Sequence, residues 1–320
     1  MDTGLSDFLT AMKRKGSVNV VDIENELKVE KISTGVPELD RALGGGGLPE
    51  TSVVELYGVE MSAKTTLGLI MASKNQENNV ICWLDFENSF NRSLAESLGV
   101  DLYKNFVVVK PESFEEGADV IDTFLEKTKV RSIIFVDSLA WMTVSKVLEE
   151  GHEGATSPIL AKKLGPALQK WMHLIRKTKS LLVFINHKKE LINMSGWSSG
   201  AKVFVTPGGK SIKYAANVRL DFNLKEFIYK TINGDRKKVG QKLKIVVTKN
   251  RFAAPYDFAE VNLIFGKGVF SDEQIKNGDY ERIAVEDTKD IKEVDEESLP
   301  SIDVMTKKRG RPSKSVTDNV

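Results

Sequence analysis

Short apolar runs alternate with amphipathic segments along most of the chain. The apolar runs are rich in β-branched and aromatic residues, which favour strands. They lie at 52–58, 79–87, 106–110, 132–138, 181–186, 218–224, 242–248 and 260–266. Helical spacing appears between the earlier runs, for example in KTTLGLIMASK and EEGADVIDTFLEKT. Because strands that alternate with helices form sheets covered on both faces, the pattern predicts an α/β fold with a mixed, mostly parallel sheet. The last strands follow one another without helices, so we expect that part of the sheet to be antiparallel.

The N-terminal residues form a separate small unit. Leu5, Phe8 and Met12 recur at helical spacing and the β-branched run VNVV follows them, which predicts a short helix and one strand. Elements this small cannot bury their own apolar faces, so we expect them to dock on the main body or on another chain. We therefore divide the chain into an N-terminal segment, 1–32, a main body, 33–274, and a C-terminal tail, 275–320.

Length and composition are those of an ordinary soluble globular protein. The 320 residues are 41% hydrophobic and 28% charged, which excludes disorder as the general state. No apolar run approaches the ~18 residues that span a bilayer, and the N-terminus does not resemble a signal peptide, so we expect an intracellular protein. The single cysteine, Cys82, excludes an internal disulfide and a zinc framework, and we expect it to be a small buried hydrophobic residue.

The net charge of +1 hides an uneven distribution of charge towards the C-terminus. Residues 281–297 hold eight acids and three bases. A basic run, KKRGRPSK, follows at 307–314 without an acid. Because strand patterning stops near residue 275 and charge then dominates, we expect a disordered tail that is first acidic and then basic.

A phosphate-binding loop is indicated where the first long strand meets a helix. The segment GVEMSAKTT, 58–66, has the order strand, glycine-led loop, Lys-Thr and helix, and a purely structural turn is the alternative. Backbone N–H groups of such a loop point at phosphate oxygens, Lys64 adds a positive charge, and the Thr65 hydroxyl is a Mg²⁺ ligand. The candidate nucleotide-binding residues are Gly58, Val59, Glu60, Met61, Ser62, Ala63, Lys64, Thr65 and Thr66. Ala63 replaces the usual glycine, and we expect its Cβ to be tolerated if φ is negative while narrowing the approach of the phosphate.

Three carboxylates are candidates for the same site. Asp137 ends the run SIIFVDS, where a carboxylate can hold the Mg²⁺ shell, and an ordinary strand-end cap is the alternative. Glu87, at the end of WLDFE, is placed to orient or deprotonate the attacking water. Asp85 lies two residues earlier on the same face and competes for that role. For Glu87 and Asp85 the alternative is an unpaired surface acid.

Ordered blocks over roughly residues 15–270 resemble the bacterial and phage RecA recombinases. The blocks are KISTGVPELDRALGGGGLPETSVVELYGVEMSAKTTL, LDFENSFNRSLAESLGVD, IIFVDSLAWMT, LLVFINH, TPGGKSIKYAANVRLDF and VVTKNRFAAPY. We interpret the chain as a phage-type homologue of these proteins. The resemblance implies a RecA-type P-loop ATPase core over 33–274 with two DNA-binding loops. It also implies ATP and Mg²⁺ as cofactors, with ATP bound between adjacent subunits of a filament.

Roles in ATP hydrolysis follow from the resemblance position by position. It implies phosphate, Mg²⁺ and catalytic roles for Lys64, Thr65, Glu87 and Asp137. His187 follows Asn186 where the family has an Asn-Gln pair that senses the γ-phosphate; a histidine's charge can follow pH, and a structural histidine is the alternative. Lys249 and Arg251 resemble two basic residues that the family inserts into the neighbour's ATP site, where such cations stabilise the transferring phosphoryl group. A solvated strand end is the alternative for both.

The base-binding positions depart from the family pattern. Asn91 stands where the family has an Asp near the adenine amino group, and Leu94 stands where it has a stacking Tyr. We therefore expect altered adenine affinity or selectivity. Phe90 is a candidate replacement for the lost stacking, and a role in the core is the alternative.

The resemblance implies DNA contacts in two Gly- and Ser-rich segments, and long polar stretches inside a compact domain are usually functional or mobile. Segment 149–163 has the place of the family's first DNA-binding loop, and 188–211 has the place of the second. Lysines there neutralise phosphates, an aromatic ring stacks on bases, and glycines allow close approach. The candidates are Lys162, Lys163, Lys188, Lys189, Trp197, Lys202, Gly208, Gly209 and Lys210. For any single lysine, a solvated surface position is the alternative.

The two ends of the chain carry further expectations. Val18 and Val20, in KGSVNVV, resemble the strand by which each family subunit extends its neighbour's sheet, so both are candidates for the filament interface. We expect no counterpart of the family's C-terminal domain after about residue 275. Arg309 and Arg311 lie instead in RGRP, which resembles an AT-hook that binds a narrow A·T-rich minor groove. A merely basic solubilising tail is the alternative.

The sequence therefore predicts a DNA-dependent ATPase that hydrolyses ATP to ADP and phosphate. By resemblance, it polymerises on single-stranded DNA as a homo-oligomeric helical filament and catalyses homologous pairing and strand exchange with double-stranded DNA. Single-strand-binding and mediator proteins are further expected partners, a membrane is not, and the expected location is the cytoplasm of a bacterium or phage-infected host cell. Two alternatives stay open: a DNA-binding filament scaffold with weakened ATPase activity, and a RecA-fold repair ATPase or helicase-type motor.

Overall fold

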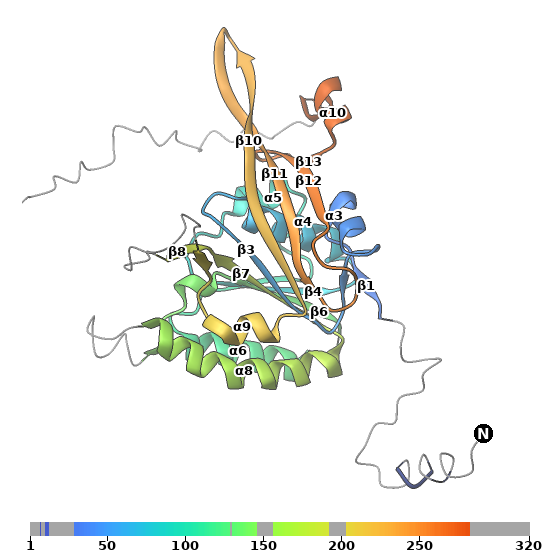
Figure 1. Ribbon diagram of the computed structural model, residues 1–320, viewed down its shortest axis with the longest axis vertical. Coiled ribbons are helices and arrows are strands. Elements are labelled where there is room, and N and C mark those ends of the chain that lie inside the picture. Colours follow the sequence, from blue (N-terminus) through green and yellow to red (C-terminus); the bar gives the residue numbers. More distant parts are fainter. Residues whose placement is uncertain are drawn as a thin grey trace, which may run out of the picture. The chain divides into compact units, whose positions relative to one another are not determined.

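One mixed sheet forms the centre of the molecule (Figure 1). The computed structural model describes residues 7, 10–12, 29–128, 130–145, 156–191 and 203–281. Within these residues the sheet has nine strands: β3 (Val53–Gly58), β4 (Val80–Asp85), β5 (Phe106–Val109), β6 (Ser132–Asp137), β7 (Leu181–His187), β10 (Val218–Ile232), β11 (Asp235–Asn250), β12 (Phe258–Ile264) and β13 (Gly268–Phe270).

The order of the strands is β13-β12-β11-β10-β3-β7-β6-β4-β5. From β10 to β5 all neighbours are parallel, whereas β10 to β13 form an antiparallel meander. The predicted α/β fold with a mixed, mostly parallel sheet is therefore confirmed. Two short pairs lie outside this sheet: β1 (Lys31–Ile32) with β2 (Leu48–Pro49), and β8 (Lys189–Leu191) with β9 (Val203–Val205).

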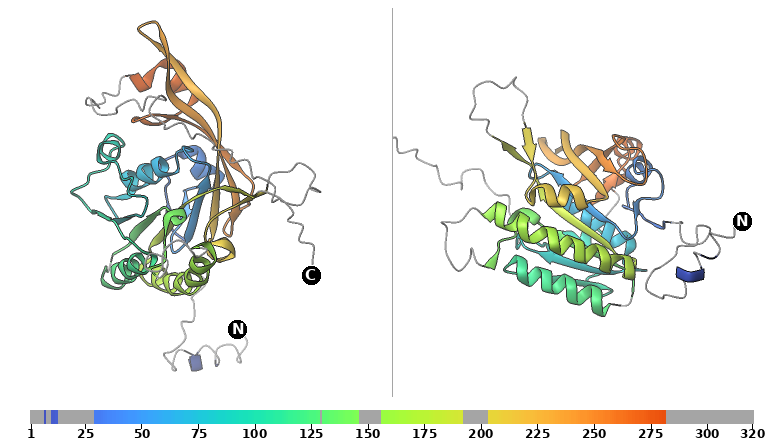
Figure 2. Two further views of the ribbon diagram at one scale, coloured as in Figure 1. Left: turned by 90° about the vertical axis from the view of Figure 1, so that its left-hand side faces the viewer. Right: turned by 60° about the horizontal axis from the view of Figure 1, so that its bottom comes forward.

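Helices cover both faces of the sheet, as Figures 1 and 2 show. One face carries α3 (Pro37–Ala42), α4 (Lys64–Asn75) and α5 (Arg92–Ser97), and the other carries α6 (Phe114–Lys127), α8 (Thr156–Thr178) and α9 (Gly209–Ala215). Each face has its own apolar cluster. Because side chains alternate along a strand, the consecutive residues Trp83 and Leu84 enter different clusters. Cys82 is buried, as expected from its apolar surroundings.

A buried ion pair joins three neighbouring strands at the middle of the sheet. Glu55 of β3 is fully buried and accepts hydrogen bonds from Arg219 Nε of β10 at 2.5 Å and from Asn186 Nδ2 of β7 at 2.8 Å. The Arg219 guanidinium also lies 4.4 Å from the centroid of the Tyr57 ring. Because a buried carboxylate is costly without a partner, these contacts favour this register of the three strands over others.

The hairpin of β10 and β11 is much longer than the two expected strands, 218–224 and 242–248. The strands span 15 and 16 residues, and the hairpin projects from the sheet (Figure 2). Its turn is formed by Asn233 and Gly234, with φ values of 54° and 91°. Asn-Gly is the preferred dipeptide for a two-residue turn with two positive φ angles, because both residues tolerate the left-handed region.

The ends of the chain are described only in part. Residues 7 and 10–12 are helical, while Val18 and Val20 lie outside the described residues. At the other end, α10 (Asp272–Asn277) and η2 (Asp279–Glu281) continue past the expected start of the tail. The start of the predicted disordered tail is therefore helical, and the rest of it, 282–320 with Arg309 and Arg311, lies outside the described part of the chain. None of the described helices is long and apolar enough to cross a membrane.

Removing Arg219 tests the buried ion pair. Arg219→Ala leaves the carboxylate of Glu55 buried without its cation, and we expect the free energy of unfolding to fall by about 3–5 kcal/mol. Urea denaturation followed by circular dichroism measures this change. The control is Lys104→Ala, which removes an exposed pair with Glu77 and is expected to leave the midpoint unchanged. Equal midpoints for the two variants would show that Glu55 does not depend on Arg219.

Candidate nucleotide-binding site

The candidate phosphate loop lies between the end of β3 and the start of α4, the context that the sequence predicted. Gly58 has no room for a side chain, because a Cβ there would come within 2.7 Å of the Phe222 carbonyl oxygen. Ala63, just before α4, has φ 61° and ψ 25°. The φ angle is therefore positive, not the negative value at which its Cβ was expected to be tolerated. A left-handed non-glycine residue costs roughly 1–2 kcal/mol.

Lys64 is buried at the start of α4 and is held by the loop that precedes it. Its Nζ donates to the Val59 carbonyl at 2.7 Å, to Ser62 Oγ at 3.2 Å and to the Gly58 carbonyl at 3.4 Å. Burial lowers the pKa of Lys64 to about 8, while nearby carboxylates oppose this shift. An anionic phosphate in the loop would favour the charged ammonium, so this lysine is suited to bind one.

Thr65 and Asp137 have the arrangement expected of a Mg²⁺ site. Thr65 Oγ1 donates to Asp137 Oδ2 at 3.0 Å. The other carboxylate oxygen, Asp137 Oδ1, is buried without a hydrogen-bond partner in the described residues. Burial raises the pKa of Asp137 to about 7, and the carboxylates of Glu87 and Asp85 add to the shift. A hydroxyl and a carboxylate with an unsatisfied oxygen are hard oxygen donors, which fit Mg²⁺ and its bound water.

Glu87 and His187 face each other across the same cavity. Their side chains approach to 3.7 Å between Glu87 Oε2 and His187 Nε2. Burial and the charge of Lys64 lower the pKa of His187 below its ordinary value of 6.5, so the imidazole is neutral at pH 7. A neutral histidine can donate one hydrogen bond without adding charge.

Asp85 does not share the role of Glu87. Its two carboxylate oxygens accept hydrogen bonds from the backbone N–H groups of Ser89 and Phe90, each at 3.0 Å. The side chain is fully buried and closes the turn after β4. Asp85 is therefore a structural carboxylate, and among the two candidates only Glu87 lines the cavity.

The residues expected near the base lie away from the described cavity. Asn91 caps α5, where its side chain accepts a hydrogen bond from Leu94 N at 2.9 Å. Phe90 packs edge-on against Trp83, with ring centroids 5.9 Å apart, and belongs with Leu94 to the apolar core. Of the two roles considered for Phe90, the structure therefore favours the core.

The cavity has a volume of about 410 Å³ and includes residues that sequence analysis missed. Gln241 of β11, Leu263 of β12 and Phe265 line it beside the phosphate loop. Phe265 is 44% exposed, and its ring is an aromatic surface of the kind that stacks on a base. No local motif marks these residues, because they reach the loop only through the pairing of β10 with β3 and of β11 with β10.

Asn186 connects the cavity with the second candidate DNA loop. It precedes His187 on β7, and its Nδ2 donates both to Glu55 Oε1 and to the Pro207 carbonyl, the latter at 3.0 Å. Pro207 directly precedes Gly208, the residue before α9. A movement of Asn186 would therefore reach the start of α9 through a single hydrogen bond.

Lys249 and Arg251 lie at the opposite edge of the sheet from the phosphate loop. Arg251 N donates to the Asn217 carbonyl, and Asn217 N donates to the carbonyl of Val53, the first residue of β3. The loop starts at Gly58, the last residue of β3, so the two levels are separated by roughly 17 Å at ~3.3 Å per residue. Neither basic residue lines the cavity of its own chain.

The two basic side chains bind the end of α9. Lys249 Nζ donates to the carbonyls of Lys213 and Tyr214 at 2.7 and 3.2 Å, and Arg251 Nη2 donates to Tyr214 at 3.0 Å. Cations at a helix C-terminus are favourable because they satisfy its last carbonyls and complement its dipole. Arg251 is exposed and Lys249 is partly exposed, so both are accessible from outside.

The candidate DNA lysines differ in their surroundings. Lys162, Lys189 and Lys210 are exposed. Lys163 is paired with Glu115 at the start of α6. The Lys188 side chain is only 10% exposed, is paired with Asp221, and lies 5.5 Å from the ring centroids of Tyr57 and of Phe204. A DNA contact by Lys188 would have to break this pair, so its geometry favours a structural role.

The two glycines at the start of α9 have positive φ angles, 83° at Gly208 and 60° at Gly209. At Gly208 a Cβ would also lie within 2.9 Å of Leu139 Cδ2, so close packing excludes a side chain there. Gly209 has more room and is exposed. Trp197 and Lys202 lie outside the described residues.

Comparison with known proteins agrees with this geometry. Residues 5–270 match the sequence model of the RecA N-terminal domain. The chain is 35% identical to Protein RecA of Synechocystis sp. over 257 residues, which cover 80% of this chain and 70% of that protein. It is 32% identical to Protein RecA of Lactococcus lactis subsp. cremoris over 291 residues, covering 89% and 72%. In fold it is similar to the crystal structure of the RadB recombinase, with a TM-score of 0.53 and 22% identity over 74% of this chain and 98% of that one. The chain therefore belongs to the RecA family.

Proposed function

We propose that this protein is an ATP-dependent homologous recombination protein. It polymerises on single-stranded DNA and catalyses homologous pairing and strand exchange, with ATP and Mg²⁺ as cofactors. One observation carries the proposal: the phosphate cavity and the two accessible cations lie at opposite edges of one subunit. A site divided in this way is completed when subunits associate head to tail, which is the arrangement that forms a filament.

The residues of the cavity divide the work of binding and hydrolysing ATP. Lys64 and the backbone N–H groups at the start of α4 bind the phosphates. Thr65 and Asp137 would hold Mg²⁺ directly or through water, and the ion would supply positive charge against the phosphates. Glu87 orients and deprotonates the attacking water, and neutral His187 donates a hydrogen bond to the terminal phosphate. Phe265 stacks on the base in place of the aromatic residue that the α5 region lacks.

A neighbouring subunit supplies the remaining charges. Lys249 and Arg251 cannot reach the phosphates of their own chain across the length of β3, but both are accessible at the outer edge of the sheet. Placed against the neighbour's terminal phosphate, such cations can raise the rate of hydrolysis by ~10³-fold or more. Hydrolysis then depends on assembly, because no single subunit holds the complete site.

A DNA-binding filament scaffold with weakened ATPase activity is the second candidate, and a specific observation favours it. The Cβ of Ala63 adjoins the phosphate cavity with a left-handed backbone, where the usual motif has glycine. A poorer fit of the phosphates would reduce hydrolysis without preventing assembly. DNA-stimulated release of phosphate separates the two candidates, because the scaffold predicts none.

Mixing two inactive variants tests whether the site is shared. Lys64→Ala and Arg251→Ala are each expected to lose ATPase activity stimulated by single-stranded DNA. In an equimolar mixture, about one quarter of the junctions combine an intact phosphate loop with an intact arginine, so about a quarter of the activity should return. Phosphate release on poly(dT) measures it.

The matched control for this experiment is Lys74→Ala, which changes an exposed lysine in the last turn of the same helix, α4. It should retain full activity alone. An equimolar mixture that stays inactive while both variants still bind DNA would show that Arg251 does not act on a neighbour, and would contradict the proposal.

The affinity for Mg²⁺ and nucleotide should depend on pH on both sides of neutrality. Because the pKa of Asp137 is about 7, the carboxylate that holds Mg²⁺ becomes protonated below that pH, and affinity should fall by up to about tenfold per pH unit. Because the pKa of Lys64 is about 8, affinity should also fall above pH 8 as the ammonium loses its proton. Titration with a fluorescent ATP analogue at constant ionic strength measures the profile.

Two variants identify the groups responsible. Asp137→Asn should lose the fall on the acid side, whereas His187→Gln should keep it, which excludes His187 as its source. An acid limb that persists unchanged in Asp137→Asn would contradict the assignment of Asp137 to the Mg²⁺ site.

A further inference from the structure

The outer part of the β10–β11 hairpin is a ribbon without other strands beside it. On one side, β3 accompanies β10 only as far as the pair Gly58 and Phe222. On the other side, β12 accompanies β11 only from the pair Ile264 and Gly240. Residues 228–239 therefore form a two-stranded ribbon, which we call the arm, and it projects from the sheet (Figures 1 and 2). An isolated two-stranded ribbon is marginally stable at best in water. The base of the arm also contacts the rest of the chain, because Phe265 N donates to the Val239 carbonyl at 3.0 Å and Lys230 Nζ lies 5.9 Å from the ring centroid of Tyr280.

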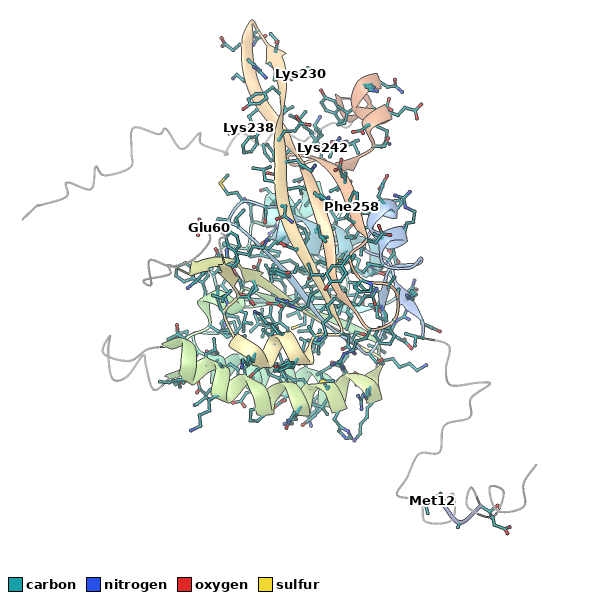
Figure 3. The ribbon with its side chains drawn as sticks, in the orientation of Figure 1. Met12, Glu60, Lys230, Lys238, Lys242 and Phe258 are labelled. Atoms are coloured by element: carbon teal, nitrogen blue, oxygen red, sulfur yellow. The ribbon has the colours of Figure 1, made fainter. Side chains whose placement is uncertain are left out.

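The arm is basic, and two of its lysines face each other in the ladder. It holds four bases and one acid, namely Lys230, Arg236, Lys237, Lys238 and Asp235. Lys230 and Lys237 are directly opposite each other in the ladder. Like charges at such a pair repel each other, so an anion is attracted to this part of the arm. Lys230 is also the lysine that lies near the Tyr280 ring. Figure 3 shows Lys230 and Lys238 on the projecting part and Lys242 closer to the sheet.

One face of the hairpin carries aromatic rings with cations held against them. Arg236 lies 4.3 Å from the ring centroid of Tyr229, and Lys238 lies 3.9 Å from that of Phe227. The ladder explains this arrangement, because Tyr229 is opposite Lys238 and each cation therefore reaches the ring diagonal to it. Cations held in this way lose less side-chain freedom on binding an anion.

The position of the arm connects it with the site already described. β10 runs parallel to β3, so the arm leaves the sheet at the edge where the phosphate loop lies. Gln241, opposite Phe227 at the base of the arm, lines the nucleotide cavity. The β8–β9 pair, which lies within the second candidate DNA segment, starts at the same edge, directly after β7.

We propose that the arm binds the phosphate backbone of double-stranded DNA. A two-stranded ribbon fits the major groove of a duplex, and lysines and arginines along it neutralise phosphates without selecting a sequence. The large apolar side chains exposed on the arm are Tyr229 and Ile232, which do not form the continuous apolar face that membrane insertion requires. The choice of DNA among polyanions rests on the proposed function, but the arm is separate from the nucleotide cavity and can be tested separately.

The test removes charge from the arm alone. The variant carries Arg236→Gln, Lys237→Gln and Lys238→Gln, and its control carries Lys127→Gln, Arg176→Gln and Lys177→Gln, three exposed bases on α6 and α8. Fluorescence anisotropy measures affinity for a labelled duplex of mixed sequence over a series of KCl concentrations. We expect the arm variant to bind on the order of tenfold more weakly, with a salt slope smaller by about 0.9 for each lost phosphate contact. Its ATPase activity on poly(dT) should equal that of the control.

Three outcomes would overturn the proposal. The first is a duplex affinity and salt slope equal to those of the control. The second is an equal loss of poly(dT)-stimulated ATPase, which would assign the arm to single-stranded DNA or to folding. The third is weaker binding to phosphatidylserine vesicles with unchanged duplex binding, which would assign the arm to a membrane surface.

A second variant, Lys237→Arg with Lys238→Arg, keeps the charge and should restore duplex binding. If the unmodified chain shows no ATPase activity, the proposed function is contradicted, but the binding of the arm to duplex DNA can still be measured.

Discussion

Parallel pairing of the central strands is the constraint from which the geometry of the site follows. In a parallel sheet all carboxyl ends meet at one edge, so Gly58, Asp137 and His187 come together although they are far apart in sequence. The antiparallel turn into β11 has the opposite effect, because it carries Lys249 and Arg251 back to the other edge. The phosphate loop and the two cations are thus separated by one strand length inside each subunit. Under the proposed function, head-to-tail association brings the phosphate loop of one subunit and the cations of the next together.

A short series of contacts joins the two edges. Asn186 donates to the carbonyl of Pro207, just before α9, and the last carbonyls of α9 accept from Lys249 and Arg251. The helix is therefore held at one end by a residue beside the nucleotide cavity and at the other by the cations that we assign to a neighbour's site. Because α9 begins inside the second candidate DNA segment, 188–211, a shift of this helix would move groups at all three places.

The sequence predicted the elements with strong local patterns and missed those that depend on distant pairing. The phosphate loop was found because its order of strand, loop and helix is local, and Asp137 because it ends a buried strand. Phe265 and Gln241 were missed because only the sheet brings them to that loop. The long hairpin was missed although Asn233 and Gly234 are a strong turn signal, since the residues around them are too polar for the strand pattern.

The departure at Ala63 also becomes understandable in physical terms. A left-handed alanine costs roughly 1–2 kcal/mol, which a glycine would avoid. The Ala63 methyl group, however, packs against the apolar cluster beneath α4, and burying one such carbon contributes about 0.8 kcal/mol. This packing offsets only part of the conformational cost, because Ala63 is partly buried, and the loop still leads into Lys64 at the start of α4. The alanine therefore adds backbone strain and gains some apolar packing. It leaves the backbone N–H groups at the start of α4 in place.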